Sequence, residues 1–169
     1  MLTIDTQVNF IQSLVKAVDQ KGAQIFLRRA RTAIAAGNYA QAIMLLTKAI
    51  GLDPYLAAAY YNRGLAKALQ INGVKNEGVR KGGNISAIRD YQAALSINPK
   101  SAEAHYQIGL ATAILENYRE AIKFFTAAIE LYDDYLEAYM ARGYAMLGIY
   151  EEPGAQADFA HAQGLLLWK

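Results

Sequence analysis

The sequence contains no cysteine, and this absence excludes disulfide bonds, thiolate catalysis and every metal site built from thiolates. A cysteine-free chain fits a reducing compartment, so we expect a cytoplasmic protein. Long apolar runs are also absent, and no stretch approaches the roughly 18 residues of a membrane span. The first residues lack the cationic start and apolar stretch of a secretory signal. We therefore expect neither a membrane span nor secretion.

The chain also has little excess of positive over negative charge. The 17 lysine and arginine residues face 15 aspartate and glutamate residues, which leaves a formal net charge of +2. An excess this small does not favour nucleic acid as a partner. Proline is equally scarce, with 3 residues in 169, whereas alanine is the commonest residue. This composition favours helix, because alanine has the highest helix propensity and proline the lowest.

Apolar residues recur at helical spacing. Ala42, Leu46, Ala49 and Ile50 follow the i, i+4, i+7, i+8 pattern of one helical face. Glycine, alanine and aromatic positions then recur with a period of 34 residues. The recurring positions are Gly109 and Gly143; Ala87, Ala121 and Ala155; Tyr91, Phe125 and Phe159; Ala94, Ala128 and Ala162. The step from Ala42 to Ala87 is 45 residues, so one repeat contains an insertion of 11.

This pattern resembles the tetratricopeptide repeat family, whose unit of 34 residues is a helix, a turn and a second helix. The resemblance covers residues 23–169 and implies an all-α, right-handed superhelical solenoid of four repeats. The repeats are expected at residues 23–56, 57–101, 102–135 and 136–169. The strings Tyr-Asn-Arg-Gly from Tyr61 and Ala-Arg-Gly from Ala141 are similar to bacterial members, in particular cyanobacterial ones.

Small residues at helix crossings and turn residues at helix ends give the repeat a physical basis. Where the first helix of a repeat crosses the second, a larger side chain would force the helices apart, and these positions hold Gly64, Gly109 and Gly143. Pro54 and Pro99 end the second helix of their repeats. Asp133 replaces this proline in the third repeat, and as a turn residue it is expected to end the helix at the same place.

The insertion lies within residues 71–83, between the two helices of the second repeat. It is rich in glycine and carries Lys75, Arg80 and Lys81 against Glu77. A phosphate-binding loop is excluded, because no lysine followed by serine or threonine stands at the required spacing and a helix precedes the segment. Two interpretations stay open: a tolerated surface loop, or a mobile basic flap that contacts an acidic partner.

Both ends of the chain depart from the repeat. Within residues 1–22, Ile4, Val8, Ile11, Val15 and Val18 mark one face of an amphipathic helix. This helix is expected to cap the open end of the solenoid, or else to lie in a groove of its own or of a neighbouring molecule. The final helix carries an apolar edge that is a candidate self-association surface, formed by Leu165, Leu166, Leu167 and Trp168.

Catalytic and metal-binding patterns are missing. His105 occupies a slot that tyrosine fills in neighbouring repeats, so packing explains it, and neither it nor His161 has a partner at ligand spacing. The acidic pairs Asp133-Asp134 and Glu151-Glu152 lie at expected turns, where solvation or helix capping explains them. We expect no enzymatic activity, no metal and no cofactor.

The resemblance implies that side chains of the first helix of each repeat line a concave wall that holds a peptide of another protein. By repeat phase, the expected wall consists of Leu27, Arg28, Arg31, Tyr61, Asn62, Leu65, Tyr106, Gln107, Leu110, Met140 and Tyr144, together with Ala141. One subset of the family captures acidic chaperone tails with lysine, asparagine and arginine. Only Asn62 fits that set, and Glu103 and Gln107 replace its later basic residues.

We therefore predict a non-catalytic scaffold or assembly factor that binds an apolar or amphipathic segment of another protein. The alternative is a structural homo-oligomer, built through the N-terminal helix and the apolar C-terminal edge. Fold by itself does not fix function, so the groove chemistry carries the first prediction.

Overall fold

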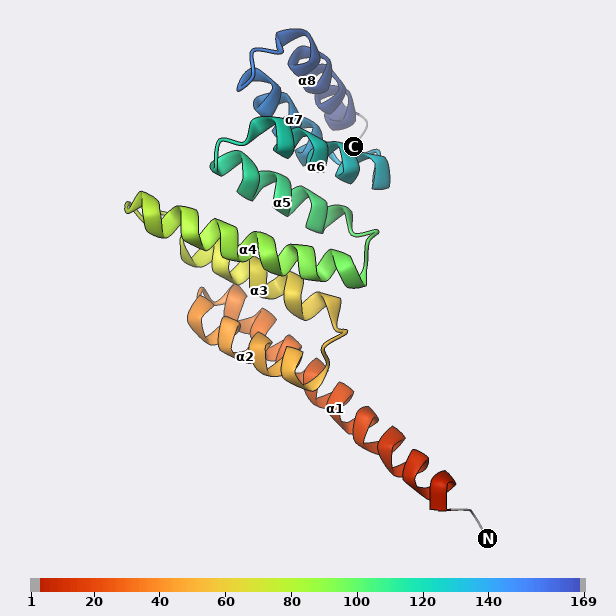
Figure 1. The fold of residues 1–169 in the computed structure, drawn as a ribbon. Helices are drawn as coiled ribbons and strands as arrows, with labels where there is room; N and C mark the ends of the chain where they lie inside the picture. The colour runs from red at the N-terminus through yellow and green to blue at the C-terminus, as the bar shows by residue number, and fades with distance from the viewer. Residues whose placement is uncertain (1–3, 168–169) are drawn as a thin grey trace.

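The computed structural model describes residues 4–167 and contains, within them, eight α-helices and no strand. Consecutive helices pack as antiparallel pairs, and the pairs stack into an elongated array (Figure 1). The helices are α1 (Ile4–Ala35), α2 (Tyr39–Leu52), α3 (Ala57–Gln70), α4 (Glu77–Ile97), α5 (Ala102–Ile114), α6 (Tyr118–Leu131), α7 (Leu136–Leu147) and α8 (Glu152–Leu167). The predicted all-α repeat architecture is confirmed.

Turn residues end the helices at equivalent positions. α2 ends two residues before Pro54 and α4 ends two residues before Pro99. α6 ends two residues before Asp133, so the aspartate stops the helix where proline does in the other repeats. Ser101 caps the start of α5, because its Oγ accepts a hydrogen bond from the backbone N–H of Ala104 at 3.2 Å.

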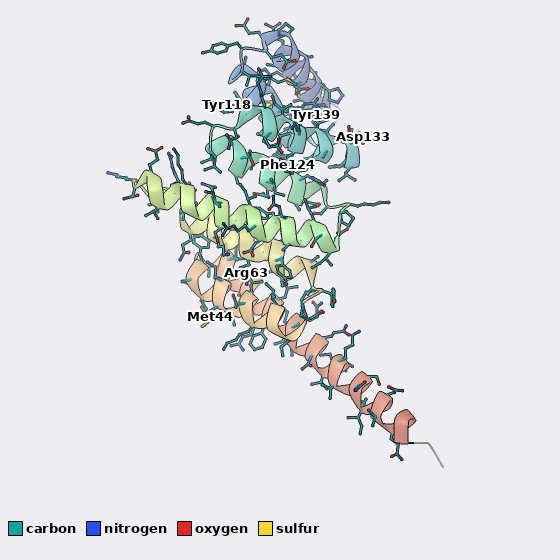
Figure 2. All side chains as sticks on the ribbon, in the orientation of Figure 1. Met44, Arg63, Tyr118, Phe124, Asp133 and Tyr139 are labelled. Carbon is teal, nitrogen blue, oxygen red and sulfur yellow. The ribbon has the colours of Figure 1, made fainter. Side chains whose placement is uncertain are left out.

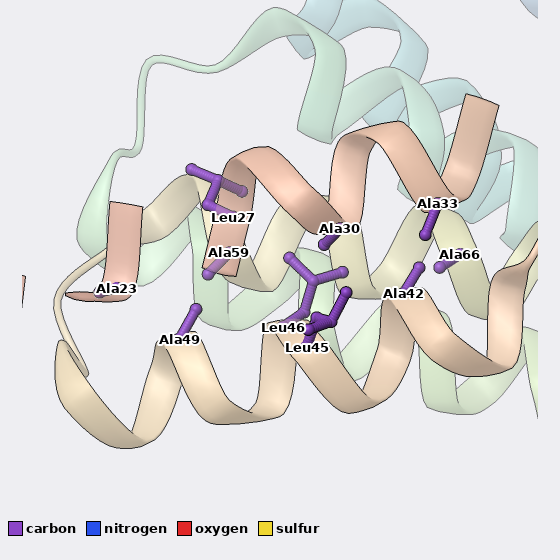
Figure 3. Packing of buried hydrophobic residues seen from close by; sticks show 10 residues of the cluster. All are labelled: Ala23, Leu27, Ala30, Ala33, Ala42, Leu45, Leu46, Ala49, Ala59 and Ala66. Atoms are coloured by element: carbon purple, nitrogen blue, oxygen red, sulfur yellow. The ribbon is translucent and has the colours of Figure 1, made fainter. Parts of the chain in front are cut away.

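Close helix crossings at glycine bring the helices of a pair together within the core. A Cβ placed on Gly109 would lie 2.5 Å from the Phe125 ring, and one on Gly143 would lie 2.6 Å from the Phe159 ring. In the first pair Ala30 takes the glycine position, and the aromatic is replaced by the smaller Leu46; both are fully buried (Figure 3). At each crossing a small residue of the first helix faces a larger residue of the second helix, and their combined volume is low enough for close contact between the helices.

The insertion is not the expected loop over most of its length. Residues 71–76 form the turn between α3 and α4, whereas residues 77–83 are the first two turns of α4, which extends past α3 (Figure 1). Asn76 caps the new helix start, since its Oδ1 accepts from the backbone N–H of Val79 at 3.0 Å. Lys81 then pairs with Glu77 at 2.6 Å across one turn. A cap and an ion pair support the helix despite its glycines, so residues 77–83 are helical and not the expected loop. Contact of this basic segment with an acidic partner stays a prediction.

The N-terminal helix does not cap the solenoid. α1 runs without a break through Gly22, so the expected boundary between residues 22 and 23 falls inside it. Its first half projects away from the other helices (Figure 1). The expected apolar face is open to solvent within one chain, with Val8 45%, Ile11 59%, Val15 55% and Val18 68% exposed. A cap would need a turn before the first repeat, and the sequence continues as helix there instead.

Candidate protein-binding groove

Four hollows follow the first helices of the four pairs. The first, of about 310 Å³, lies along α1 and includes Leu27, Arg28 and Arg31. The second, of about 350 Å³, joins Arg31 to Tyr61 and Asn62 of α3. The third, of about 700 Å³, lies between α3 and α5 and includes Leu65, Gln107 and Leu110. The fourth, of about 420 Å³, joins Leu110 to Tyr106, Met140, Ala141 and Tyr144.

These hollows form one path, which we call the groove. Arg31 lines both the first and the second hollow, and Leu110 lines both the third and the fourth. Tyr61 and Leu65, one turn apart on α3, connect the second hollow to the third. All eleven residues of the expected wall, and Ala141 with them, line the groove. Their role in binding stays a prediction.

Two of these residues, Leu27 and Asn62, are buried. Leu27 is 4% exposed and belongs to the core cluster of the first pair. Asn62 is 7% exposed, and its amide nitrogen donates to the Ala58 carbonyl oxygen at 2.7 Å. Both shape the floor of the groove, and Asn62 has one of its hydrogen-bonding groups already engaged within the chain.

The aromatic residues of the groove are held by rings beneath them. Tyr61 contacts Tyr91 at a centroid distance of 5.7 Å, and Tyr106 contacts Phe125 at 5.9 Å. Tyr144 contacts the Phe159 ring at 5.1 Å, yet it is 62% exposed. Each of these tyrosines therefore offers a ring face whose position is fixed before a partner arrives, which lowers the entropy cost of binding.

The Tyr61 and Tyr106 hydroxyl groups are protonated near neutral pH. Burial raises the pKa of Tyr61, and the nearby Glu103 carboxylate raises it further. Burial also raises the pKa of Tyr106, and Glu137 adds to this effect. Both tyrosines can donate hydrogen bonds to backbone carbonyls of a bound segment. The wall is otherwise of mixed sign, because Arg28 and Arg31 lie at one end and Glu103 and Glu137 lie farther along it.

The sequence analysis missed the contribution of the insertion to the groove. Ile71, Val74, Lys75 and Arg80 form one wall of the third hollow, opposite residues of α5. Periodicity sets an insertion apart as extra material, and it gives no signal that the extra turns border a binding surface. The added length of α4 makes this the largest of the four hollows along the groove.

A second feature that sequence analysis missed joins neighbouring repeats. Arg63 of α3, which Figure 2 labels, donates to both carboxylate oxygens of the buried Asp90 at 3.0 and 2.7 Å and to Thr47 Oγ1 at 3.3 Å. Arg142 makes the same set of bonds to the buried Asp158 at 2.7 Å twice and to Thr126 Oγ1 at 3.0 Å. We call each set a polar lock. The signal was available, because the two arginines and two aspartates stand at equivalent repeat phases.

Neither histidine of the described chain lies in a ligand cluster. The centroid of the Tyr139 ring lies 4.2 Å from that of the His161 ring, and the centroid of the Phe124 ring lies 6.3 Å from that of the His105 ring. Residues 4–167 contain no group of three or more His, Asp or Glu side chains that could hold a metal ion. No helix among them is long and apolar enough to cross a membrane.

The family is identified by its repeats. A model described as tetratricopeptide repeat matches residues 23–55 and 102–135, and one described as TPR repeat matches residues 79–113. The chain therefore belongs to the tetratricopeptide repeat family, whose members generally mediate contacts between proteins and are typically non-catalytic. A comparison with curated protein sequences gives no significant match.

Solved structures share the fold at low sequence identity. A crystal structure of MamA is 24% identical, with a TM-score of 0.76 over 95% of this chain and 87% of that one. The MamA of Desulfovibrio magneticus RS-1, residues 41 to the end, is 20% identical, with a TM-score of 0.74 over 87% of this chain and 77% of that one. The first TPR domain of Spaghetti (RPAP3), bound to an HSP90 peptide, is 22% identical, with a TM-score of 0.68 over 78% and 95%.

Proposed function

We propose that the protein is a non-catalytic scaffold that binds an apolar or amphipathic segment of another protein in its groove. The observation that carries this proposal is the run of Tyr61, Tyr106, Leu110, Met140 and Tyr144 along one path of hollows. Large aromatic side chains over fixed supports are the residues that most often dominate a protein interface. A continuous apolar path of this kind suits a helix or an extended segment with apolar side chains on one side.

The polar residues of the groove are suited to orienting a bound segment through its backbone and not to recognising an acidic tail. Gln107 lies in the third hollow beside Leu65 and Leu110, where its amide can bond a segment's backbone. Glu103 stands in the second hollow and opposes an acidic tail at the position where capture of such a tail would need a cation. We therefore keep chaperone-tail capture as the disfavoured mode. A cytoplasmic location and a role as an assembly factor are further parts of the proposal.

The test uses a displayed library that contains amphipathic, apolar extended and acidic peptides. We expect selection of amphipathic or apolar peptides, whose affinity is then measured by calorimetry. Tyr106→Ala should weaken binding by about 1 to 3 kcal/mol, because it removes a central aromatic contact, and the exposed Arg28→Ala should cost less than about 1 kcal/mol. Circular dichroism and thermal unfolding of each variant control for folding, since Tyr106 also packs on Phe125.

The dependence of affinity on salt and the heat-capacity change of binding distinguish apolar binding from binding of acidic peptides. Apolar binding should change little between low and high salt and should have a negative heat-capacity change. Selection of acidic peptides, with steep salt dependence and a dominant loss in Arg28→Ala and Arg31→Ala, would contradict the proposed groove chemistry.

A structural homo-oligomer is the second candidate, and one observation favours it at the C-terminal edge. Leu166 is 62% exposed and Leu167 is 81% exposed at the end of α8, beside the partly buried Leu165. Trp168, the other residue expected at this edge, lies outside the described residues. If the edge joins copies, Leu166→Asp should lower the mass measured by light scattering. An unchanged mass would exclude the edge as a contact.

A further inference from the structure

The projecting half of α1 carries an exposed apolar stripe, and Leu14, which is 50% exposed, lies along one side of it. Val8, Ile11, Val15 and Val18 are separated by steps of three, four and three residues, and Gly22 and Ile25 continue the same alternation. Ile25 is 49% exposed, so the stripe reaches the start of the first repeat. We call the positions 8, 11, 15, 18, 22 and 25 the seam. Every side chain described between residues 7 and 18 is exposed, so no other part of the chain covers the seam there.

The period of the seam points to another helix as its partner. Steps of three and four that alternate average 3.5 residues, which is the spacing at which one helix packs along another in a coiled coil. In the C-terminal half of α1, the buried Ala23, Leu27 and Ala30 follow the same steps of four and three, and there they pack against neighbouring helices. The spacing that packs against helices in one half of α1 therefore continues into the half that no helix of the same chain covers.

The composition of the projecting segment also calls for a partner. Its seam consists of valine and isoleucine, which lose side-chain freedom in a helix and lower its intrinsic stability. Helical segments of this length are marginal in water without packing. The flanking charges are balanced, with Asp5 and Asp19 against Lys16 and Lys21, so two copies brought together do not repel each other through this segment.

We propose that the seam is a self-association surface that pairs with the seam of a second copy of this chain. A seam matches itself in width, period and charge, and its projection leaves room for the repeats of both copies. The inference extends the homo-oligomer candidate, but it needs neither the C-terminal edge nor the groove. Peptide binding in the groove stays possible in the assembled form.

Mass measured against concentration tests the proposal. Sedimentation equilibrium of the full chain should give a mass above that of one chain, and Val15→Glu or Val18→Glu should return the mass to one chain. The matched control is Gln20→Glu, an exposed residue two positions beyond Val18 and so on the opposite side of the helix. Leu166→Asp and Tyr144→Asp should keep the larger mass, because they change only the C-terminal edge and the groove.

Introduced cysteines locate the contact, since the chain has none of its own. The Ile11→Cys and Val15→Cys variants are oxidised separately, and a mixture of the two reduced variants is oxidised in a further experiment. Parallel seams link like with like, and antiparallel seams link the two variants to each other, so either product supports the proposal. A single-chain mass for the wild type, or a mass that falls with Tyr144→Asp, would overturn it. A fall with both Tyr144→Asp and Val18→Glu would place α1 in the groove of a neighbour.

Discussion

At the residue scale, the fold depends on which side chain is absent from a helix crossing. Gly109 and Gly143 leave room for a buried ring, and the tight distances there show that even a methyl group needs rearrangement. Other glycines have no such role, and Gly51, for example, has nothing within 4 Å of its Cβ position. The repeat therefore constrains glycine at a few positions and leaves it free elsewhere.

Gly109→Leu should be strongly destabilising, because the leucine overpacks the crossing with Phe125. We expect a loss of about 1 to 3 kcal/mol or more in the free energy of urea-induced unfolding. Gly51→Leu is the matched control, and it should be neutral or slightly stabilising because it raises helix propensity at an exposed site. An unchanged unfolding midpoint for Gly109→Leu would refute the crossing.

Tyr91→Phe should preserve or raise stability. Within the described residues the buried Tyr91 hydroxyl has no hydrogen-bond partner, and the equivalent positions in the later repeats hold Phe125 and Phe159. The expected gain is up to about 1 kcal/mol in unfolding free energy. The exposed Tyr150→Phe should change nothing, and a loss above about 1 kcal/mol in Tyr91→Phe would show that the hydroxyl is needed.

The same residue predicts a pH effect. Burial raises the pKa of Tyr91 above its ordinary value of 10.0, so the unfolded chain loses this proton first. The stability of the protein should be fully present below about pH 10 and should fall as the pH rises above it. Unfolding curves between pH 8 and about pH 11 should show this fall, and Tyr91→Phe should make it smaller.

At the scale of single elements, the added turns of α4 are separable from the core. Residues 75–82 are all exposed, and the helix that would remain starts at the same repeat phase as α2 and α6. Their structural consequence is the wall of the third hollow rather than the packing of the repeat.

Deletion of residues 73–82 should leave the fold intact. The closing loop becomes shorter, and loop length has only a weak effect on stability, so we expect a change below about 1 kcal/mol in unfolding free energy. Peptides selected by the groove should nevertheless lose affinity if they reach the third hollow. A loss above about 2 kcal/mol in unfolding free energy would show that the segment belongs to the core.

At the scale of the whole molecule, neighbouring repeats are joined in two ways. The polar locks of Arg63 and Arg142 connect the first repeat to the second and the third to the fourth. Between the second and third repeats the equivalent positions hold Gln92, Ile108 and Phe124, and Ile108 is fully buried. The array thus alternates polar and apolar junctions.

Removing one partner of a polar lock should lower the unfolding free energy more than replacing both partners with apolar residues. Asp158→Ala leaves the arginine without its carboxylate and should lower the unfolding free energy by about 2 to 4 kcal/mol. The double variant Arg142→Ile and Asp158→Phe copies the apolar junction and should recover most of that loss. Glu120→Ala, which breaks an exposed pair with Lys123, should change stability by less than about 0.5 kcal/mol. Equal losses in the single and double variants would contradict this account.

The sequence by itself determined the repeat, its glycine crossings, its helix stops and the residues that the first helix of each repeat contributes to the groove. This was possible because a fixed period places equal phases on equal faces, so Tyr61, Tyr106 and Met140 must share a wall. Only the tertiary structure decided that residues 77–83 continue α4 and that the seam of α1 is uncovered. The start of α4 depends on the Asn76 cap and the Glu77–Lys81 pair, local features that the low helix propensity of glycine hides in the sequence pattern. Whether an apolar face is buried or open depends on what folds against it, which local sequence does not determine.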